Sequence, residues 1–231
     1  IETDILVKKD SIKIKSSEVI NIKNNKLNYL GEINLNPFHL DMNIELDKLN
    51  FEKDIFNNNL LQNLFELEQL YNVNLSSKIN LRINNLIKNR LFNSSKILIN
   101  FGNGTINFNN TIFTGLSGNL NLIDGNMLNI KDNLIFNGNF VFDVLSRNEF
   151  YRIFQIGKKN RKKIENFYFN IEYNFTKKEF KIRNLIFDPA NVKSEDELSD
   201  FLDENSQQGK ISNWIDFKNF VKKVFENYYD G

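Results

Sequence analysis

The sequence lacks most of the residues that build catalytic sites. It contains no cysteine, which excludes disulfide bonds, thiolate metal sites and cysteine nucleophiles. It has one histidine, His39, so a His-based triad or a site with several histidines cannot be built from this chain. Its carboxylates are plentiful but scattered, and no pair of them is singled out by its spacing. We therefore predict a protein that is not an enzyme and that needs no cofactor and no metal. A carbohydrate-active enzyme with a cross-strand carboxylate pair is the less favoured alternative.

The chain also lacks a strong net charge and a long apolar run. Its 30 Lys and Arg residues nearly balance its 29 Asp and Glu residues, so no overall field favours nucleic acid as a partner. No apolar run approaches the roughly 18 residues that are needed to cross a bilayer. Because the sequence begins at Ile1 rather than Met, we expect a fragment or a processed product whose signal peptide or membrane anchor lies outside it.

What the chain has in abundance is alternation of apolar and polar residues. Ile12 and Ile14 alternate with lysines, and the segment from Leu40 to Leu46 continues the same pattern. A period of two places the apolar side chains on one face of a β-strand. Similar segments recur to residue 187, separated by polar turns that we expect at Gly102–Gly104 and at Asp124–Asn126. The sequence predicts a mainly β fold, with an elongated, curved, antiparallel sheet.

Helical spacing occurs in three places. Apolar residues fall on one stripe over 54–71, and Ser146 with Glu149 forms a capping box that opens a helix over about 146–157. Residues 191–209 are acidic and poor in large apolar groups, and they predict a flexible linker. An amphipathic helix is expected over 210–231. We therefore expect one β domain over 1–190, followed by the linker and the terminal helix.

Two local features allow two interpretations each. The basic run of Lys158, Lys159, Arg161, Lys162 and Lys163 is typical of a solvated helix end, or it contacts anionic lipid headgroups. The terminal helix, with Trp214, Phe225 and Tyr228 on its apolar side, either packs on the domain or docks on a membrane or a partner.

The apolar strand faces exceed what the expected helices can cover. The faces are rich in Phe, with 22 in the chain, and in Ile. Either the sheet folds over on itself, or part of the face stays open as a hydrophobic groove for acyl chains or for a protein partner.

Several segments resemble the AsmA-like C-terminal region of bacterial envelope proteins. The segment 31–40, GEINLNPFHL, is similar to the strand and "PF" step of that family. The strand at 42–46, the "LNF" at 49–51, and the segments 97–108 and 134–143 resemble its repeated strands. The likeness covers roughly residues 10–190.

The resemblance implies a periplasmic portion of an inner-membrane-anchored protein in the group that includes AsmA, TamB and YhdP. Members of that group extend a taco-shaped β groove and help phospholipid to reach the outer membrane or assist outer-membrane assembly. The implied partners are phospholipid, the membrane surface and envelope assembly proteins. An assembly module that holds a protein strand in the groove is the alternative. The expected groove residues are Ile33, Leu35, Leu40, Met42, Ile44, Phe101, Ile106, Phe136, Phe140 and Phe142, to which the strand pattern adds Phe167 and Phe169.

Overall fold

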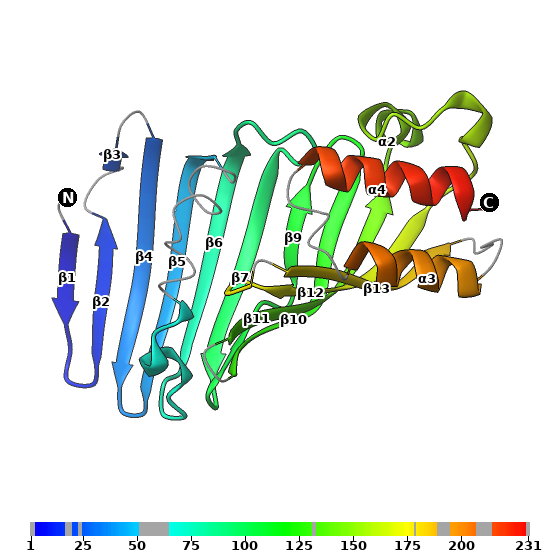
Figure 1. Cartoon of the computed structure of the whole chain (residues 1–231). Helices are drawn as coiled ribbons and strands as arrows, with labels where there is room; N and C mark the ends of the chain where they lie inside the picture. The colour runs from blue at the N-terminus through cyan, green and yellow to red at the C-terminus, as the bar shows by residue number, and fades with distance from the viewer. Residues whose placement is uncertain are drawn as a thin grey trace. The chain divides into compact units, whose positions relative to one another are not determined.

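The chain is mainly β and divides into two compact units. The computed structural model describes residues 3–16, 20–22, 25–50, 65–130, 133–177, 179–188, 195–206 and 214–229. The first unit comprises Ile1–Phe113 with Asn126–Leu128, and the second comprises Thr114–Gly125 with Asn129–Gly231. The mainly β fold with a large curved, mostly antiparallel sheet is confirmed, and the described residues include three α-helices (Figure 1). The single domain expected over 1–190 is instead shared between the two units.

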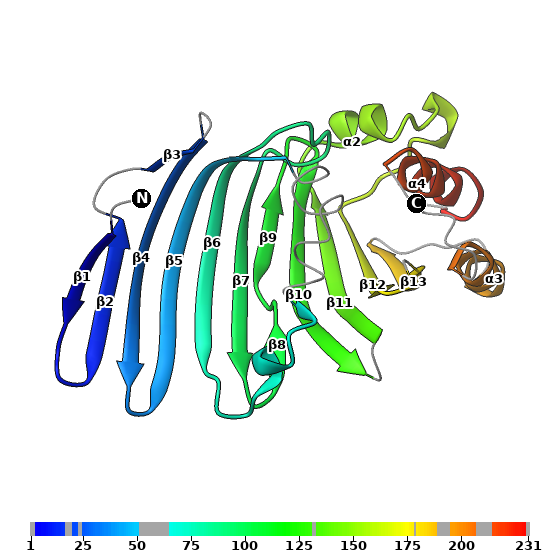
Figure 2. The ribbon, with the colours of Figure 1, turned by 60° about the vertical axis from the view of Figure 1, so that its left-hand side comes forward.

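The first unit is a sheet in which the strands follow one another in the order β1-β2-β4-β5-β6-β7-β8. Their bounds are β1 Thr3–Val7, β2 Ser11–Ser16, β4 Asn25–Leu35, β5 Phe38–Leu49, β6 Ser77–Leu86, β7 Ser94–Gly102 and β8 Thr105–Asn107. The short β3 (Ile20–Ile22) pairs with β4, and β9 (Thr111–Thr114) pairs with β7. Figure 2 shows the strands of this sheet side by side, with a bend along their length.

One strand pair of the first unit is parallel, which differs from the antiparallel sequence of strands that alternation predicts. Strands β5 and β6 run in the same direction, with Leu40 opposite Ser77 and Ile44 opposite Leu81. A parallel pair needs a crossover of a dozen residues or more, and the chain between Leu49 and Ser77 supplies it. Most of the helix expected at 54–71 lies outside the described residues. Its described end forms a short 3-10 helix, η2 (Glu68–Tyr71).

The second unit is a sheet covered by helices. Its strands are β10 (Gly118–Ile130), β11 (Asn133–Val144), β12 (Asn166–Asn174) and β13 (Glu179–Asp188), in that order. Strand β10 runs through Asp124–Asn126, so the turn expected there is wrong. The turn expected at Gly102–Gly104 is confirmed between β7 and β8, where Asn103 and Gly104 have φ of 53° and 73°.

In the described part of the second unit, the helices are α2 (Arg147–Ile153), α3 (Glu195–Ser206) and α4 (Trp214–Asn227). The N-cap expected at Ser146 is confirmed, because its side chain accepts a hydrogen bond from the backbone N–H of Glu149 at 3.4 Å. The reciprocal half of the capping box does not form, because the Ser146 N–H donates to the Ser117 carbonyl at 3.1 Å and the Glu149 carboxylate pairs with Arg152. A 3-10 turn, η3 (Lys158–Asn160), follows α2. No helix in the described parts of the chain is both long enough and apolar enough to cross a bilayer.

The acidic segment after β13 is a helix and not the linker that its composition predicts. Within α3, Leu198 and Leu202 are buried, and Phe201 stacks on Phe220 of α4 with ring centroids 5.6 Å apart. Three large apolar residues at spacings of three and four are sufficient to hold an amphipathic helix against a neighbour, even when the other residues are acidic. Composition averaged over the segment hides this stripe.

Candidate functional site

The strongest candidate site is one face of the sheet in the first unit, which we call the apolar face. Residues directly opposite one another on neighbouring strands project from the same side of a sheet, so the register defines three rows across it. The rows are Val7-Ile12-Ile33-Leu40-Ser77-Phe101-Ile106-Met127, Ile5-Ile14-Gly31-Met42-Ile79-Ile99 and Tyr29-Ile44-Leu81-Ile97. Apart from Gly31, Ser77 and the hydroxyl of Tyr29, every member is an aliphatic, Met or Phe side chain.

Sequence reasoning placed seven residues of the first unit in a lipid-binding set, and all seven lie on the apolar face or at its hairpin end. Ile33, Leu40, Phe101 and Ile106 share one row, Met42 and Ile44 belong to the next two, and Leu35 pairs with Phe38 at the end of the β4–β5 hairpin. Alternation alone assigned them to strands. The register of the sheet, including the parallel β5–β6 pair, is what brings them together.

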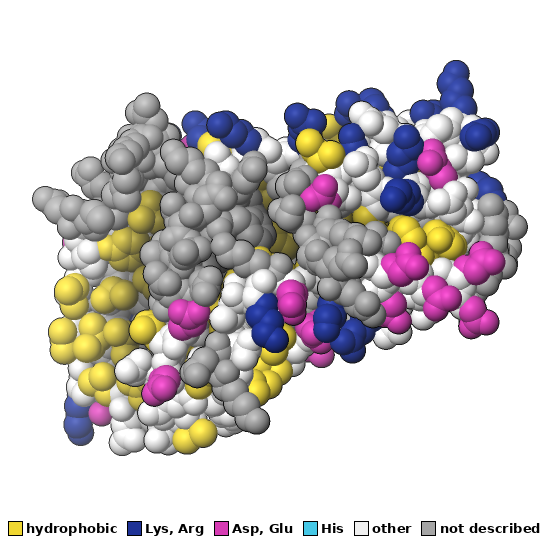
Figure 3. All heavy atoms as spheres, in the orientation of Figure 1, with side chains coloured by type: hydrophobic (Ala, Val, Ile, Leu, Met, Phe, Trp, Pro, Cys, Tyr) yellow, Lys and Arg dark blue, Asp and Glu magenta, His cyan; other side chains and the backbone are white. Residues whose placement is uncertain are grey.

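The apolar face is closed at one side of the unit and open at the other. At the closed side, Ile106 of β8 is 0% exposed, Phe101 of β7 is 9% exposed and Met127 of β10 is 2% exposed, and η2 contacts β7 and β8. This burial corrects the expectation that Ile106 and Phe101 offer an open surface for lipid. Across β5 and β6 the side chains of Leu40, Met42 and Leu81 are half-buried. At β1, Ile5 is 63% exposed and Val7 is 68% exposed. Figure 3 shows hydrophobic side chains gathered at the side of this unit where β1 and β2 lie.

The opposite face of the same sheet is polar. Lys13 forms an ion pair with Glu32 at 3.4 Å, and Lys15 forms one with Asp4 at 3.5 Å. The Asn80 amide donates to Asn43 at 3.0 Å, and the Asn84 amide donates to Glu45 at 2.9 Å. These cross-strand contacts belong to a solvated surface, so the two faces of the sheet differ sharply in character.

In the second unit, the expected lipid-binding residues form a closed core. The Phe142 ring stacks on Phe167 at 4.9 Å, and the Phe140 ring stacks on Phe169 at 5.4 Å. All four side chains are less than a tenth exposed. Only Phe136, 6.3 Å from Phe140 between ring centroids, is half-buried. These four buried side chains therefore offer no open surface for lipid, which corrects the expectation that they line a lipid-binding groove.

The helices explain why this core is closed. Phe150 of α2 lies 5.8 Å from Phe142 and 5.3 Å from Phe225 of α4, measured between ring centroids. The cavity between the sheet and α4 measures only about 20 Å³ and is lined by Phe167, Phe187, Val224 and other apolar side chains. That is about the room for one water molecule, and an apolar cavity of this size stays dry. It cannot hold an acyl chain.

The terminal helix follows the packing interpretation. Phe225 is 2% exposed, and Tyr228 stacks on Phe201 with ring centroids 4.9 Å apart. Neither ring is therefore presented for docking on a membrane, which corrects that expectation. Trp214 begins α4, and its side chain lies outside the described residues.

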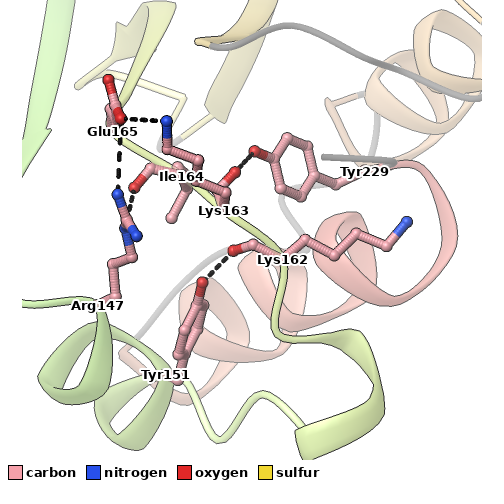
Figure 4. A network of polar contacts seen from close by, with 7 residues as sticks. All are labelled: Arg147, Tyr151, Lys162, Lys163, Ile164, Glu165 and Tyr229. Atoms are coloured by element: carbon pink, nitrogen blue, oxygen red, sulfur yellow. Dashed lines mark hydrogen bonds and ion pairs between the residues drawn. The ribbon is translucent and has the colours of Figure 1, made fainter.

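The basic run is partly structural (Figure 4). The Arg161 side chain donates to the Ile156 carbonyl at 3.1 Å, and its guanidinium lies 5.6 Å from the centroid of the Tyr151 ring. Lys163 forms an ion pair with Glu165 at 2.8 Å and holds the pKa of that carboxyl below its usual value. Lys158 and Lys159 are exposed. The side chains of Arg161 and Lys163 therefore contact other groups of the second unit, which favours a structural role over headgroup contact for these two residues.

Two tyrosines hold the same segment from either side (Figure 4). The Tyr151 hydroxyl of α2 donates to the Lys162 carbonyl, and the Tyr229 hydroxyl, beyond α4, donates to the Lys163 carbonyl. Arg147 donates to the Ile164 carbonyl at 3.0 Å. The segment that leads from α2 into β12 is thus fixed by side chains from both ends of the unit. We therefore assign a structural role to this segment: its hydrogen bonds stabilise the second unit.

Alkaline pH is expected to weaken the second unit through Tyr229. Burial raises the pKa of the Tyr229 hydroxyl from its usual value of 10.0 to about 12. The neutral phenol is therefore favoured in the folded state. The stability that the neutral Tyr229 phenol adds to the folded state is complete below about pH 10 and is lost as the pH rises from about 10 to about 12. In urea unfolding, Tyr229→Phe should be less stable than the parent at neutral pH and should lose stability less steeply between about pH 10 and about pH 12. Tyr168→Phe, at an exposed ring, is the control; equal slopes for Tyr229→Phe and the parent would contradict this account.

The described residues contain no cluster of His, Asp and Glu suited to a metal ion. The apolar face can bind a ligand by removing apolar surface of the ligand and of the protein from water.

Comparison of this chain with protein-family models, with curated proteins and with solved structures finds no match.

Proposed function

We propose that the apolar face of the first unit binds phospholipid acyl chains and that the protein supports lipid transport between membranes and outer-membrane assembly without catalysis. The observation that supports this most is the gradient of exposure along one face. The rows are continuous across the strands, yet they become more exposed from β8 to β1. Exposed apolar patches of this kind mark sites for ligands, membranes or partners.

The width of the apolar face matches an acyl chain. The row from Ile14 to Ile99 crosses five neighbouring strands, which at about 4.8 Å per strand spacing is roughly 19 Å. The hydrocarbon core of a bilayer is about 30 Å thick, so the chains of one leaflet reach about 15 Å. A chain of a membrane phospholipid therefore fits across the half-buried centre of the face.

The energetics favour apolar contact alone. Each methylene removed from water contributes about 0.8 kcal/mol, so about ten of them contribute about 8 kcal/mol, which corresponds to micromolar binding before the entropic cost of association. The apolar rows contain no charged side chain that would have to be desolvated. The polar face, with its paired Lys13–Glu32 and Lys15–Asp4, offers no comparable surface.

Two further elements belong to the same proposal. The exposed Lys158 and Lys159 are candidates for contact with anionic headgroups, each contributing up to about 1 kcal/mol near a charged surface. The resemblance of segments 31–40 and 42–46 to AsmA-like proteins favours the periplasm as the location, with envelope assembly proteins as partners.

Purified protein is expected to retain phospholipid. Lipids extracted from the folded chain after expression in a Gram-negative host, and identified by mass spectrometry, should include phospholipids in a reproducible ratio to protein. A folded preparation without phospholipid, which also fails to bind a fluorescent fatty acid, would contradict the proposal. A module that holds only a protein strand would give that result.

Polar substitutions on the apolar face should reduce lipid binding, while the same change on the opposite face should not. Met42→Gln with Ile44→Gln places two amides at the half-buried centre of the face. Loss of two apolar contacts is expected to weaken binding of a fluorescent fatty acid by about tenfold or more. Leu30→Gln is the matched control, because Leu30 is exposed and pairs with Lys15 and Asn43 on the polar face. Equal affinities for the two variants, both with parental circular dichroism, would refute the assignment of the site to this face.

A further inference from the structure

The outer strand of the first unit is an exposed and apolar edge. All five residues of β1 are exposed, including Ile5 at 63%, Leu6 at 56% and Val7 at 68%. Among the described residues β1 pairs only with β2. An apolar edge strand exposes a row of backbone donors and acceptors and is a template for another strand.

The hydrogen-bond phase of β1 shows which residues would receive that strand. The Lys8 N–H donates to the Ser11 carbonyl at 2.8 Å, and hydrogen-bonded pairs alternate along an antiparallel ladder. Leu6 and Asp4 therefore direct their backbone groups toward β2. The backbone N–H and C=O groups of Thr3, Ile5 and Val7 point away from β2, toward the side of β1 that pairs with no described strand.

The sequence of this edge complements itself. Two antiparallel copies of Asp4-Ile5-Leu6-Val7-Lys8, centred on Leu6, place Asp4 opposite Lys8 of the other copy at both ends. Ile5 then lies opposite Val7, and both have outward backbone groups, so four backbone hydrogen bonds form. Centring the pair on Ile5 would also match the backbone groups, but it would place Asp4 opposite Leu6. Charge complementarity selects the first register, because opposite charges on facing residues stabilise a strand pair.

We propose that two copies of this chain pair through antiparallel β1 strands, centred on Leu6 and held in register by two Asp4–Lys8 ion pairs. The two-fold axis passes between the Leu6 residues and runs perpendicular to the sheet. Ile5 and Val7 of both copies then project from the same side, so the apolar faces of the two first units adjoin. The proposal goes beyond lipid binding and does not depend on it.

Sedimentation should show a weak, concentration-dependent dimer of the 27.2 kDa chain. Ile5→Pro removes an outward N–H and leaves the donors to β2 intact, which is where edge strands tolerate proline. This variant should remain monomeric at every concentration with unchanged circular dichroism, while Ile5→Val should still dimerise. A parent chain that is monomeric throughout, or an Ile5→Pro variant that dimerises as the parent does, would overturn the proposal.

Charge exchange tests the register. Asp4→Lys alone and Lys8→Asp alone each place like charges opposite one another twice, and each should weaken self-association about tenfold or more. A mixture of these two variants restores two attractive pairs, so heterodimers should form with nearly parental affinity. Variants that associate no better when mixed than alone would overturn the register.

A cysteine on the two-fold axis supplies an independent readout, because the chain has no cysteine of its own. Non-hydrogen-bonded partners in an antiparallel pair have Cα atoms about 4.5 Å apart, which is within the range of a disulfide. Leu6→Cys should form a covalent dimer under mild oxidation. Val7→Cys, which faces Ile5 of the other copy, should cross-link far more slowly, and equal rates for the two variants would count against the pairing.

Discussion

Phe150→Ala is expected to lower the free energy of unfolding of the second unit by about 3–5 kcal/mol. Phe150 is 0% exposed and lies at the centre of the aromatic core, with its ring centroid 4.7 Å from Phe154 and 5.9 Å from Phe167. Removing the ring deletes contacts with α4 and with the sheet at once. It leaves a cavity that well-packed neighbours cannot fill.

The measurement is urea unfolding of the purified chain, followed by far-UV circular dichroism and by the fluorescence of Trp214, the single tryptophan. Leu145→Ala is the control in the same unit, because Leu145 lies next to the N-cap of α2 and is 65% exposed. Its change should stay within about 0.5 kcal/mol. A loss below about 1.5 kcal/mol at Phe150 would mean that the helices do not close the core as described.

Gly118→Ala is expected to destabilise the second unit by about 3 kcal/mol or more, the upper end of what overpacking costs. A methyl group at Gly118 would lie 2.2 Å from the backbone oxygen of Asp143 and 2.5 Å from a ring carbon of Phe142. Both neighbours are fixed, one as backbone of β11 and the other inside the aromatic core. The strands can accept the methyl only by moving apart.

Gly102→Ala provides the contrasting case. A methyl group at Gly102, the last residue of β7, meets nothing within 4 Å, so the midpoint of urea unfolding should hardly change. Gly118→Ala should lower that midpoint and reduce the yield of folded protein. If the two variants had similar midpoints, the close approach of β10 and β11 at Gly118 would be contradicted.

Both units contain strands with one apolar face, but that face is covered by helices in the second unit and partly exposed in the first. In the second unit the apolar strand faces meet α2 and α4, and rings such as Phe167 and Phe187 lie within about 6.1 Å of one another. In the first unit the apolar rows end at β1 in exposed side chains. The expectation that apolar strand surface exceeds the covering helices therefore applies to the open side of the first unit and fails for the second.

Some predictions failed because composition and local pattern are averages. The segment Asp124–Asn126 has turn residues, yet it lies within β10. A Cβ at Gly125 would lie 2.8–3.2 Å from carbons of the Leu122 side chain, so the glycine leaves room for that side chain. The acidic segment around Leu198 and Leu202 reads as a linker by composition, although three apolar residues suffice to dock it. The contact that docks α3 is made with Phe220 of α4, so it cannot be inferred from the residues next to Leu198 and Leu202.

By itself the sequence determined the mainly β class, the two-residue period that separates apolar from polar side chains, the capped helix at Ser146 and the turn at Gly102–Gly104. Each of these follows from short-range geometry, in which a residue's conformation and direction depend on near neighbours. The tertiary structure decided the parallel β5–β6 pair, the division into two units and which apolar faces are covered. These depend on contacts between residues far apart in the chain, such as Phe150 with Phe225, that no local pattern encodes.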